Sequence, residues 1–209
     1  MKIERLGWIV AAALAGAMIG MGFQEKGTKT GTVDLERVFN ESAYAKSQTE
    51  GLRNMGQARV TVVEFLRTYR TLKPEDANKF RDLSLKATPT AADKAELERI
   101  KNQAMSDEQK YRELSTKDKP TQAEVNQIEE FNRRKDTTAN LLEKWNGEFT
   151  NELQTRQESL RGETLQRVKD AVAQVAKDQG YSIVFVQNVA PYSANDLTAE
   201  ALKAMNNKK

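Results

Sequence analysis

Residues 181–186 read YSIVFV, a strand signal in a chain that otherwise carries the patterns of helices. β-branched and aromatic side chains favour extended backbone, and both faces of this stretch are apolar. Gly180 stands directly before it and is suited to end a helix, because glycine adopts the left-handed conformation readily. We therefore predict a helix that stops at Gly180 and a strand that follows it.

The sequence beyond this strand predicts a hairpin and a final helix. Residues 187–188 (QN) offer a turn, and Val189–Tyr192 can then pair back as a second short strand. Pro191 lacks the N–H that a ladder hydrogen bond needs, so this strand should lie at an edge or be irregular. Thr198 is suited to cap a last helix over Ala199–Met205.

A third strand is expected near the other end of the chain, at Gly31–Leu35, which reads GTVDL. A helix is predicted from Glu36 to Leu72, because apolar side chains there recur at steps of three and four residues. These apolar positions are Leu52, Met55, Val62, Val63, Leu66 and Tyr69.

Prolines divide the helical middle of the chain. Pro74, Pro89 and Pro120 each block a helical hydrogen bond, and each stands before sequence that suits the start of a new helix. No proline occurs from Thr121 to Gln179, which permits one helix about 90 Å long. We therefore predict a broken outgoing run of helices and a continuous returning one.

Within the long helix, two sets of side chains recur every 11 residues. Such a step gives about 3.67 residues per turn, which suits straight or slightly right-handed pairing of helices. The first set is Phe131, Leu142 and Leu153, and the second is Thr138, Phe149, Leu160 and Ala171.

The β elements at the two ends can meet only if the helical residues 36–180 return to their starting point. A hairpin with its tip near residues 118–120 achieves this. If wholly helical, residues 36–117 would exceed the returning helix by about 35 Å, so the excess must be folded away. We predict that Glu75–Thr88, which lies between two prolines, forms a short displaced helix.

The predicted fold class is therefore α+β and mostly α. Residues 31–35 and 181–209 would form a small, discontinuous β-body from the N-terminal strand and the C-terminal hairpin. Residues 36–180 would form a long helical-hairpin tentacle, with residues 24–30 as a linker before the first strand.

The first 23 residues have the pattern of a secretory signal. Lys2 and Arg5 make a basic start, and Leu6–Phe23 is uncharged and rich in Ala and Gly. A buried core helix is the less favoured alternative, since glycines interrupt the stretch. Eighteen apolar residues are near the lower limit for crossing a bilayer, so a cleaved signal peptide and an uncleaved inner-membrane anchor both stay open. Either way, we expect an exported protein.

The composition excludes most catalytic chemistry. The chain has no Cys and no His, so it lacks a thiol nucleophile, a thiolate zinc site and the commonest general base. It also has no phosphate-cradling glycine loop and no nucleophile elbow. Lys and Arg number 33 against 30 Asp and Glu, a near balance that argues against a dedicated nucleic-acid binder. We predict no enzyme activity, no cofactor and no metal.

The charged clusters are interpreted as solvated helix faces. The acidic pair 129–130 sits among basic residues, and the basic run Arg133–Lys135 is flanked by acids. Trp145 and Phe149 lie one helical turn apart, which favours packing in a helix pair over a surface that contacts another protein.

Two stretches carry a resemblance to a known family. GTVDLERVFNES at Gly31–Ser42 resembles the start of the mature Skp/OmpH family, a strand that runs into a helix. YSIVFVQNVAPYSANDLTAEALKAMN at Tyr181–Asn206 resembles that family's ending, with its strand, turn and short helix. The middle matches only in being long, charged and helical, and it is longer than is usual for the family.

The resemblance implies a periplasmic, ATP-independent holdase chaperone. Family members form trimers whose strands make a small β-body, and helical tentacles project from it around a cavity that holds unfolded outer-membrane proteins. A trimer would also cover the edges of a sheet that is too small to be stable alone. The residues expected in the trimer body are Val33, Leu35, Val38, Phe39, Ile183, Phe185, Val186, Tyr192 and Leu197, and the candidate client contacts are Tyr111, Trp145 and Phe149.

A membrane-anchored coiled-coil spacer of the cell envelope is the competing interpretation. It would use Leu6–Phe23 as its anchor and would hold no client, but a spacer does not need β-rich ends. An enzyme comes third, because the sequence offers no constellation of catalytic residues.

Overall fold

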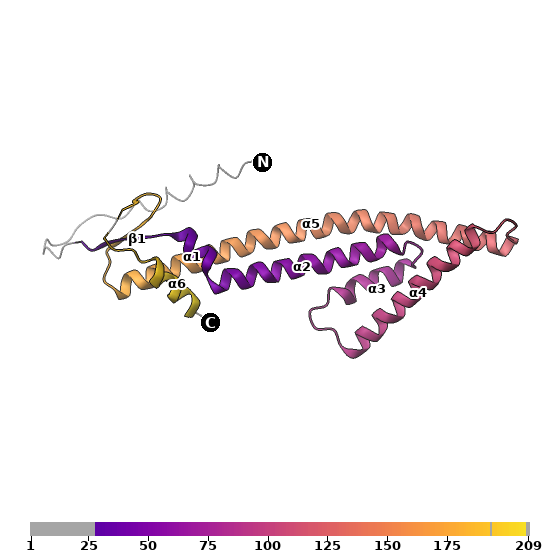
Figure 1. The fold of residues 1–209 in the computed structure, drawn as a ribbon, viewed down its shortest axis with the longest axis horizontal. Helices are drawn as coiled ribbons and strands as arrows, with labels where there is room; N and C mark the ends of the chain where they lie inside the picture. The colour runs from indigo at the N-terminus through magenta and orange to yellow at the C-terminus, as the bar shows by residue number, and fades with distance from the viewer. Residues whose placement is uncertain (1–27, 193, 208–209) are drawn as a thin grey trace. The chain divides into compact units, whose positions relative to one another are not determined.

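The computed structural model describes residues 28–192 and 194–207, so the predicted signal segment lies outside the described residues. The fold is α+β and mostly helical, as predicted. Its elements are β1 (Thr30–Val33), α1 (Leu35–Glu41), α2 (Ala43–Thr68), α3 (Pro74–Ser84), α4 (Ala91–Ser115), α5 (Gln122–Asp178), β2 (Ile183–Val186) and α6 (Thr198–Asn207) (Figure 1).

The chain divides into two compact units. We call the first unit the body; its described residues are 28–47, 161–192 and 194–207. We call the second unit, residues 48–160, the arm. The first residues of α2 and the last 18 of α5, residues 161–178, belong to the body, so the helices do not end where the units do.

A parallel pair of strands stands at the centre of the body. β1 and β2 pair in register from Thr30 opposite Ile183 to Val33 opposite Val186. Parallel neighbours need a long crossover connection, and here that connection contains the whole arm. Gly180, which has φ +72°, ends the crossover in the left-handed conformation that the sequence predicted for a helix stop.

The predicted C-terminal hairpin is wrong in the residues that the structure describes. After β2 the chain turns, with the amides of Val189 and Ala190 donating to the Val186 carbonyl at 2.8 and 3.1 Å. The next extended segment pairs with the opposite edge of β1 through a parallel bridge between Thr32 and Asp196. The second edge of β1 was free to pair with this segment, and the turn-like sequence after β2 gave no sign of that pairing. Pro191 also has no N–H to donate to the ladder of a hairpin.

The first predicted helix is also divided. It breaks at Ser42, whose backbone is extended (φ −63°, ψ 142°), and α2 then ends at Thr68 instead of continuing to Leu72. The Ser42 hydroxyl accepts a hydrogen bond from the Ala45 amide at 3.1 Å and so caps α2. Asp34 caps α1 in the same way, accepting from the Arg37 amide at 2.9 Å.

In the arm, the proline breaks fall where they were predicted. Pro74 is the first residue of the short helix α3, and Pro89 lies in the loop before Thr90, which caps α4 in a capping box with Asp93. After Pro120 the chain forms α5, a single helix of 57 residues. The predicted short displaced helix is therefore confirmed as α3, and the continuous returning helix as α5.

The arm has one apolar core to which four helices contribute. In Figure 1, α3 and α4 form a hairpin alongside α2 and α5. Six of the seven side chains in the two 11-residue series are buried, and Leu153 is half-buried, so the series does mark the inward stripe of α5. The core residues are Val62, Val63, Leu66, Leu72, Ala77, Phe80, Ile100, Ala104, Leu142, Trp145 and Phe149.

Candidate functional site

An apolar surface lies on one face of β2 in the body. Successive side chains of a strand point to opposite faces, so Ile183 and Phe185 share one face, and each is 40% exposed. Val189 and Tyr192, in the segment that follows, are 65% and 91% exposed. Apolar side chains exposed next to one another on a strand face are typical of protein interaction sites.

The nine residues expected in a trimer body separate into two groups. Val33, Val38 and Leu197 are buried within the chain's own core. Leu35 and Phe39 pack against that core, and Val186 is half-buried on the second face of β2. The exposed members, which are free to meet another chain, are Ile183, Phe185 and Tyr192.

The body is held together by hydrogen bonds between the two ends of the chain. The Thr32 amide donates to the Asn195 carbonyl, and the Leu197 amide donates to the Thr32 carbonyl, each at 2.8 Å. The Asp34 amide donates to the Thr198 hydroxyl at 2.9 Å. These bonds join the two motifs at the ends of the sequence into one folding unit.

Gly31 shows how closely the two ends pack. A Cβ atom at this position would collide with the Leu197 side chain and would lie 3.1 Å from the Tyr181 ring. A larger residue here would force the buried Leu197 side chain to shift. Lys29 lies over the same ring, with its Nζ 4.0 Å from the ring centroid of Tyr181.

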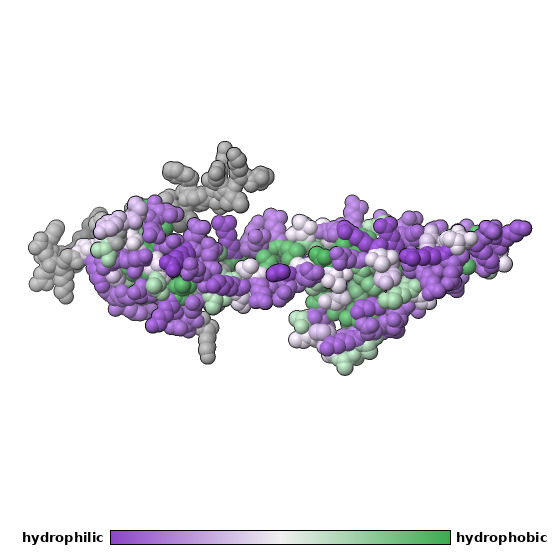
Figure 2. Space-filling model, viewed as in Figure 1, coloured by the Kyte–Doolittle hydropathy of each residue, from purple (hydrophilic) through white to green (hydrophobic). Residues whose placement is uncertain are grey.

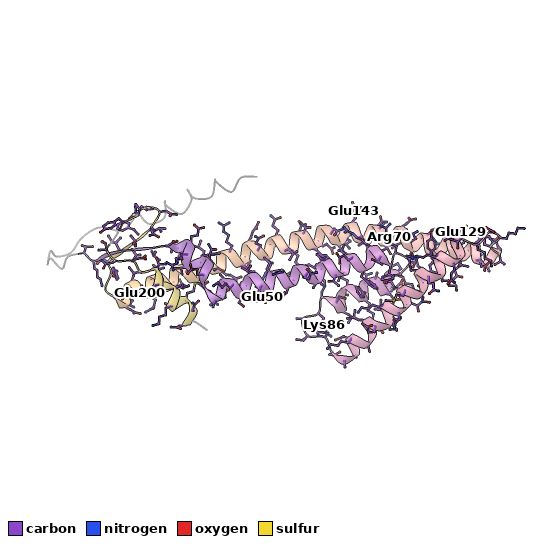
Figure 3. All side chains as sticks on the ribbon, viewed as in Figure 1. Glu50, Arg70, Lys86, Glu129, Glu143 and Glu200 are labelled. Carbon is purple, nitrogen blue, oxygen red and sulfur yellow. The ribbon has the colours of Figure 1, made fainter. Side chains whose placement is uncertain are left out.

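Charged side chains of both signs cover the arm. Glu129 and Glu143 on α5, Glu50 on α2 and Arg70 just beyond α2 all project into solvent (Figure 3). On the face shown in Figure 2, hydrophobic side chains reach the surface around α3 and the neighbouring part of α2, whereas the end of the arm around the α4–α5 turn is hydrophilic. The arm therefore carries acidic and basic side chains together.

Several carboxylates of the arm are held ionised by their neighbours. A hydrogen bond from Lys86 and others from Thr90 lower the pKa of Asp93 to about 2. Lys117 and Thr121 lower the pKa of Glu124 to about 2 in the same manner, at the first turn of α5. Both carboxylates cap helix N-termini, so the charge stabilises the start of α4 and of α5.

Two of the three predicted client contacts are not on the surface. Trp145 is 1% exposed and Phe149 is 7% exposed, and both lie in the core of the arm. In this arrangement both side chains pack between helices, because their positions on α5 fall on its inward stripe, and neither is accessible to a client. Tyr111 is half-buried: it donates to Asn132 at 3.1 Å, and the Lys135 ammonium that donates to it lowers its pKa.

The interpretation of the basic run as a solvated face is correct for Arg133 and wrong for Arg134. The side chain of Arg134 is only 16% exposed and pairs with Asp107 of α4 at 3.2 Å. A sequence signal for this burial exists, because Arg134 stands 11 residues before Trp145 and so shares its stripe. Asp107 likewise follows Ile100 and Ala104 at helical spacing, on the buried face of α4.

Arg59 is a second buried cation that the sequence reasoning did not single out. It is 9% exposed and forms two hydrogen bonds to Glu152 of α5, at 3.1 and 2.7 Å. Its guanidinium also lies 5.5 Å from the ring centroid of Phe149. A bidentate pair of this kind fixes how α2 lies against α5 within the arm.

Within residues 28–192 and 194–207, no group of three or more His, Cys, Asp or Glu side chains is arranged to hold a metal ion. In the same residues, no helix combines the length and the apolar character needed to cross a membrane. The predicted anchor at Leu6–Phe23 is not among them.

These features define a class: α+β proteins in which the two ends of the chain build a small β-body and everything between them builds a charged helical arm. The chain matches the family described as outer membrane protein (OmpH-like) over residues 29–205. It belongs to the OmpH-like family, which is known for periplasmic chaperone function and not for catalysis. No curated protein gives a significant match to the chain.

Proposed function

We propose that this protein is an ATP-independent holdase chaperone that binds unfolded outer-membrane proteins in the periplasm. The observation that carries the proposal is the family match, which spans both the body and the arm. The signal pattern of residues 1–23 supports an exported location. No nucleotide, metal or other cofactor takes part in the proposed activity.

We further propose that the protein works as a homotrimer assembled through the body. The exposed face of β2, with Ile183 and Phe185, supports this, because a two-stranded sheet is only marginally stable alone. Packing three such faces together would remove the apolar surface from water and cover the strand edges. Each trimer would then offer three arms to one client.

The arm suits the holding of unfolded chains. Its surface is rich in charge and poor in large exposed apolar side chains, so it stays soluble and does not collapse onto a client. Partly exposed apolar positions such as Val60, Met105 and Tyr111 allow many weak contacts. Several weak contacts on linked arms give useful affinity through effective concentration while each contact stays reversible.

The proposal is tested by diluting an unfolded outer-membrane β-barrel protein from urea with and without the purified protein. Light scattering should show that aggregation is suppressed without ATP, at a stoichiometry near one trimer per client. An unrelated helical protein of similar charge serves as the control. Equal aggregation in all samples would refute the chaperone proposal and leave the envelope spacer as the better description.

A further inference from the structure

A layer of polar side chains interrupts the apolar core of the arm. Arg134 on α5 donates to Asp107 on α4 at 3.2 Å and to the carbonyl of Thr71 at 3.5 Å. Asp107 also accepts from Gln103 at 2.7 Å, and the Thr71 hydroxyl donates to Glu108 at 3.3 Å. The layer therefore joins α4, α5 and the turn between α2 and α3.

A buried hydroxyl further along α5 has no hydrogen-bond partner in the described residues. Thr138, one turn along α5 from Arg134, is 0% exposed, and its hydroxyl has no hydrogen-bond partner in the part of the chain that the structure describes. A buried hydroxyl without a partner loses its hydration and gains nothing in return. The contact of α5 with the helices around it is thus weaker here than an apolar contact of the same size.

The hairpin of α3 and α4 is, in contrast, tied to itself by ion pairs. Arg99 on α4 pairs with Asp76 on α3 at 2.6 Å, and Lys79 on α3 pairs with Glu96 on α4 at 2.6 Å. Lys86, in the loop between them, pairs with Asp93 at 2.6 Å. These pairs join α3, the loop and α4, although each has a partly exposed member and contributes only modestly to stability.

Aromatic side chains lie where this hairpin packs on the other two helices. Phe80 of α3 stacks on Phe65 of α2, with ring centroids 4.0 Å apart, and Arg81 lies over the ring of Trp145 at 5.0 Å. The ion pair from Arg81 to Glu148 of α5 is long, at 3.5 Å, and both side chains are partly exposed. Removing the hairpin would expose Phe65, Phe80 and Trp145 together.

We propose that the α3–α4 hairpin is a lid that opens to present these aromatic side chains to apolar segments of an unfolded client. The inference rests on the proposed chaperone function and names the surface that would do the holding. The lid turns at residues 69–73 and 116–121, the non-helical connections on its two sides (Figure 1). The unsatisfied Thr138 hydroxyl weakens the closed state, whereas the pair of Arg134 with Asp107 has to separate when the lid opens.

Closing and binding compete in this arrangement, so a change that stabilises the closed lid must weaken client binding. When the open state is the minor one, the apparent affinity falls in proportion to the open fraction. Thr138→Val keeps the shape of the side chain and removes the buried hydroxyl, which favours the closed state. Its neighbour Thr137 is exposed and bonds to the Arg133 carbonyl, so Thr137→Val is the matched control.

The test uses tryptophan fluorescence of the full chain. Trp8 and Trp145 are the only tryptophans, so replacing Trp8 by Phe leaves Trp145 as the reporter. Acrylamide should quench Trp145 weakly in the free protein and several-fold more strongly when an unfolded outer-membrane protein that lacks tryptophan is bound. Thr138→Val should bind that client about tenfold more weakly than Thr137→Val, a difference of about 1.4 kcal/mol.

The lid proposal is refuted if Thr138→Val and Thr137→Val bind the client with equal affinity. It is also refuted if acrylamide quenches Trp145 equally with and without the client. In that case the polar layer only fixes the register of the helices. Failure of the chaperone proposal gives a different result, since then the protein with intact Thr137 and Thr138 binds no client at all. Quenching of Trp145 without client still tests the lid, because Thr138→Val should then be quenched less than Thr137→Val.

Discussion

The body and the arm of this protein are stabilised by different kinds of interaction. In the body, backbone groups near Thr32 bond to residues about 160 positions away, and the Ala43 amide donates to Asn206 at 2.8 Å. In the arm, the links are mostly side-chain ion pairs and apolar contacts between helices, such as Arg99 with Asp76. The stability of the body therefore depends on backbone segments that lie close together. The stability of the arm depends on contacts between side chains, which many different residues can make.

This difference predicts how the two units tolerate substitution. The close approach of β1 to its neighbours restricts the residue at position 31, where a Cβ would meet the Leu197 side chain. A helical arm needs mainly an inward apolar stripe, so its exposed positions accept many side chains. The body should accordingly be sensitive to single substitutions, and the arm tolerant of them.

The largest effect is expected for Phe185→Asp in the body. A charge placed in the proposed interface between chains costs several kcal/mol, so the proposed trimer should dissociate. Each chain should stay helical, because Phe185 is already 40% exposed within the chain. Light scattering with far-UV circular dichroism measures both properties.

The matched control is Val60→Asp, which changes a side chain of similar exposure, 46%, on the arm. It should leave the assembly intact. A Phe185→Asp protein that remains trimeric, or an unaltered chain that is monomeric at micromolar concentration, would show that the body does not assemble through this face of β2.

A smaller effect is expected when alanine replaces glycine in each unit. Gly31→Ala forces a Cβ into the Leu197 side chain and should destabilise the body by about 1–3 kcal/mol. Gly147→Ala places a Cβ in open space on α5 and should stabilise the arm by about 0.5–1 kcal/mol. Urea unfolding of both variants at one fixed protein concentration compares their free energies of unfolding. If both substitutions change that free energy equally, the body and the arm do not differ in packing as proposed.

Acid should weaken the arm through its capping carboxylates. The pKa values of Asp93 and Glu124 are lowered to about 2 in the folded protein, so folding favours their ionised forms. Their stabilising effect is fully present above pH about 4.5 and is lost as the pH falls towards about 2. Circular dichroism melting curves between pH 6 and 2.5 should show this loss.

The variant Asp93→Asn with Glu124→Gln tests the assignment to the caps. Its melting temperature at pH 6 should be lower than that of the unaltered protein. The melting temperature should also fall less on acidification, because two of the titrating carboxylates have been removed. Glu129→Gln, an exposed carboxylate on α5, is the control and should keep the full pH dependence. An unchanged acid response in the double variant would assign the effect to other carboxylates.

Most of the architecture could be predicted from local sequence signals. Proline breaks at Pro74 and Pro89, and the proline-free stretch that became α5, fix the helices of the arm through the missing N–H alone. The strand β2 followed from its β-branched residues and the glycine before it. Such signals act within a few residues, and therefore they can be read without knowing the rest of the fold.

The errors concern interactions between distant residues. The pairing of the segment around Asp196 with β1, in place of a hairpin with β2, depends on which strand edge is free. The burial of Arg134 depends on Asp107 of another helix, although its place on the 11-residue stripe was a usable signal. The division of the first helix rests on one serine cap at Ser42, a signal too weak to stand alone.

The candidate site could be predicted less well than the fold. Of the exposed apolar residues in the body, Ile183, Phe185 and Tyr192 were expected to take part in assembly, and that role is still a prediction. Trp145 and Phe149 were correctly placed on one stripe of a helix, but the sequence could not show that a second pair of helices covers that stripe.

The salt dependence of client binding tests most directly whether the arm holds its client through apolar contacts. The charges of the arm alternate in sign, and at physiological ionic strength they are screened over about 8 Å. Raising the salt concentration from about 0.05 M to about 0.5 M should therefore weaken binding of a labelled, unfolded outer-membrane protein less than tenfold, or about 1.4 kcal/mol. A loss of a hundredfold or more would contradict the account and show that the arm holds its client by charge.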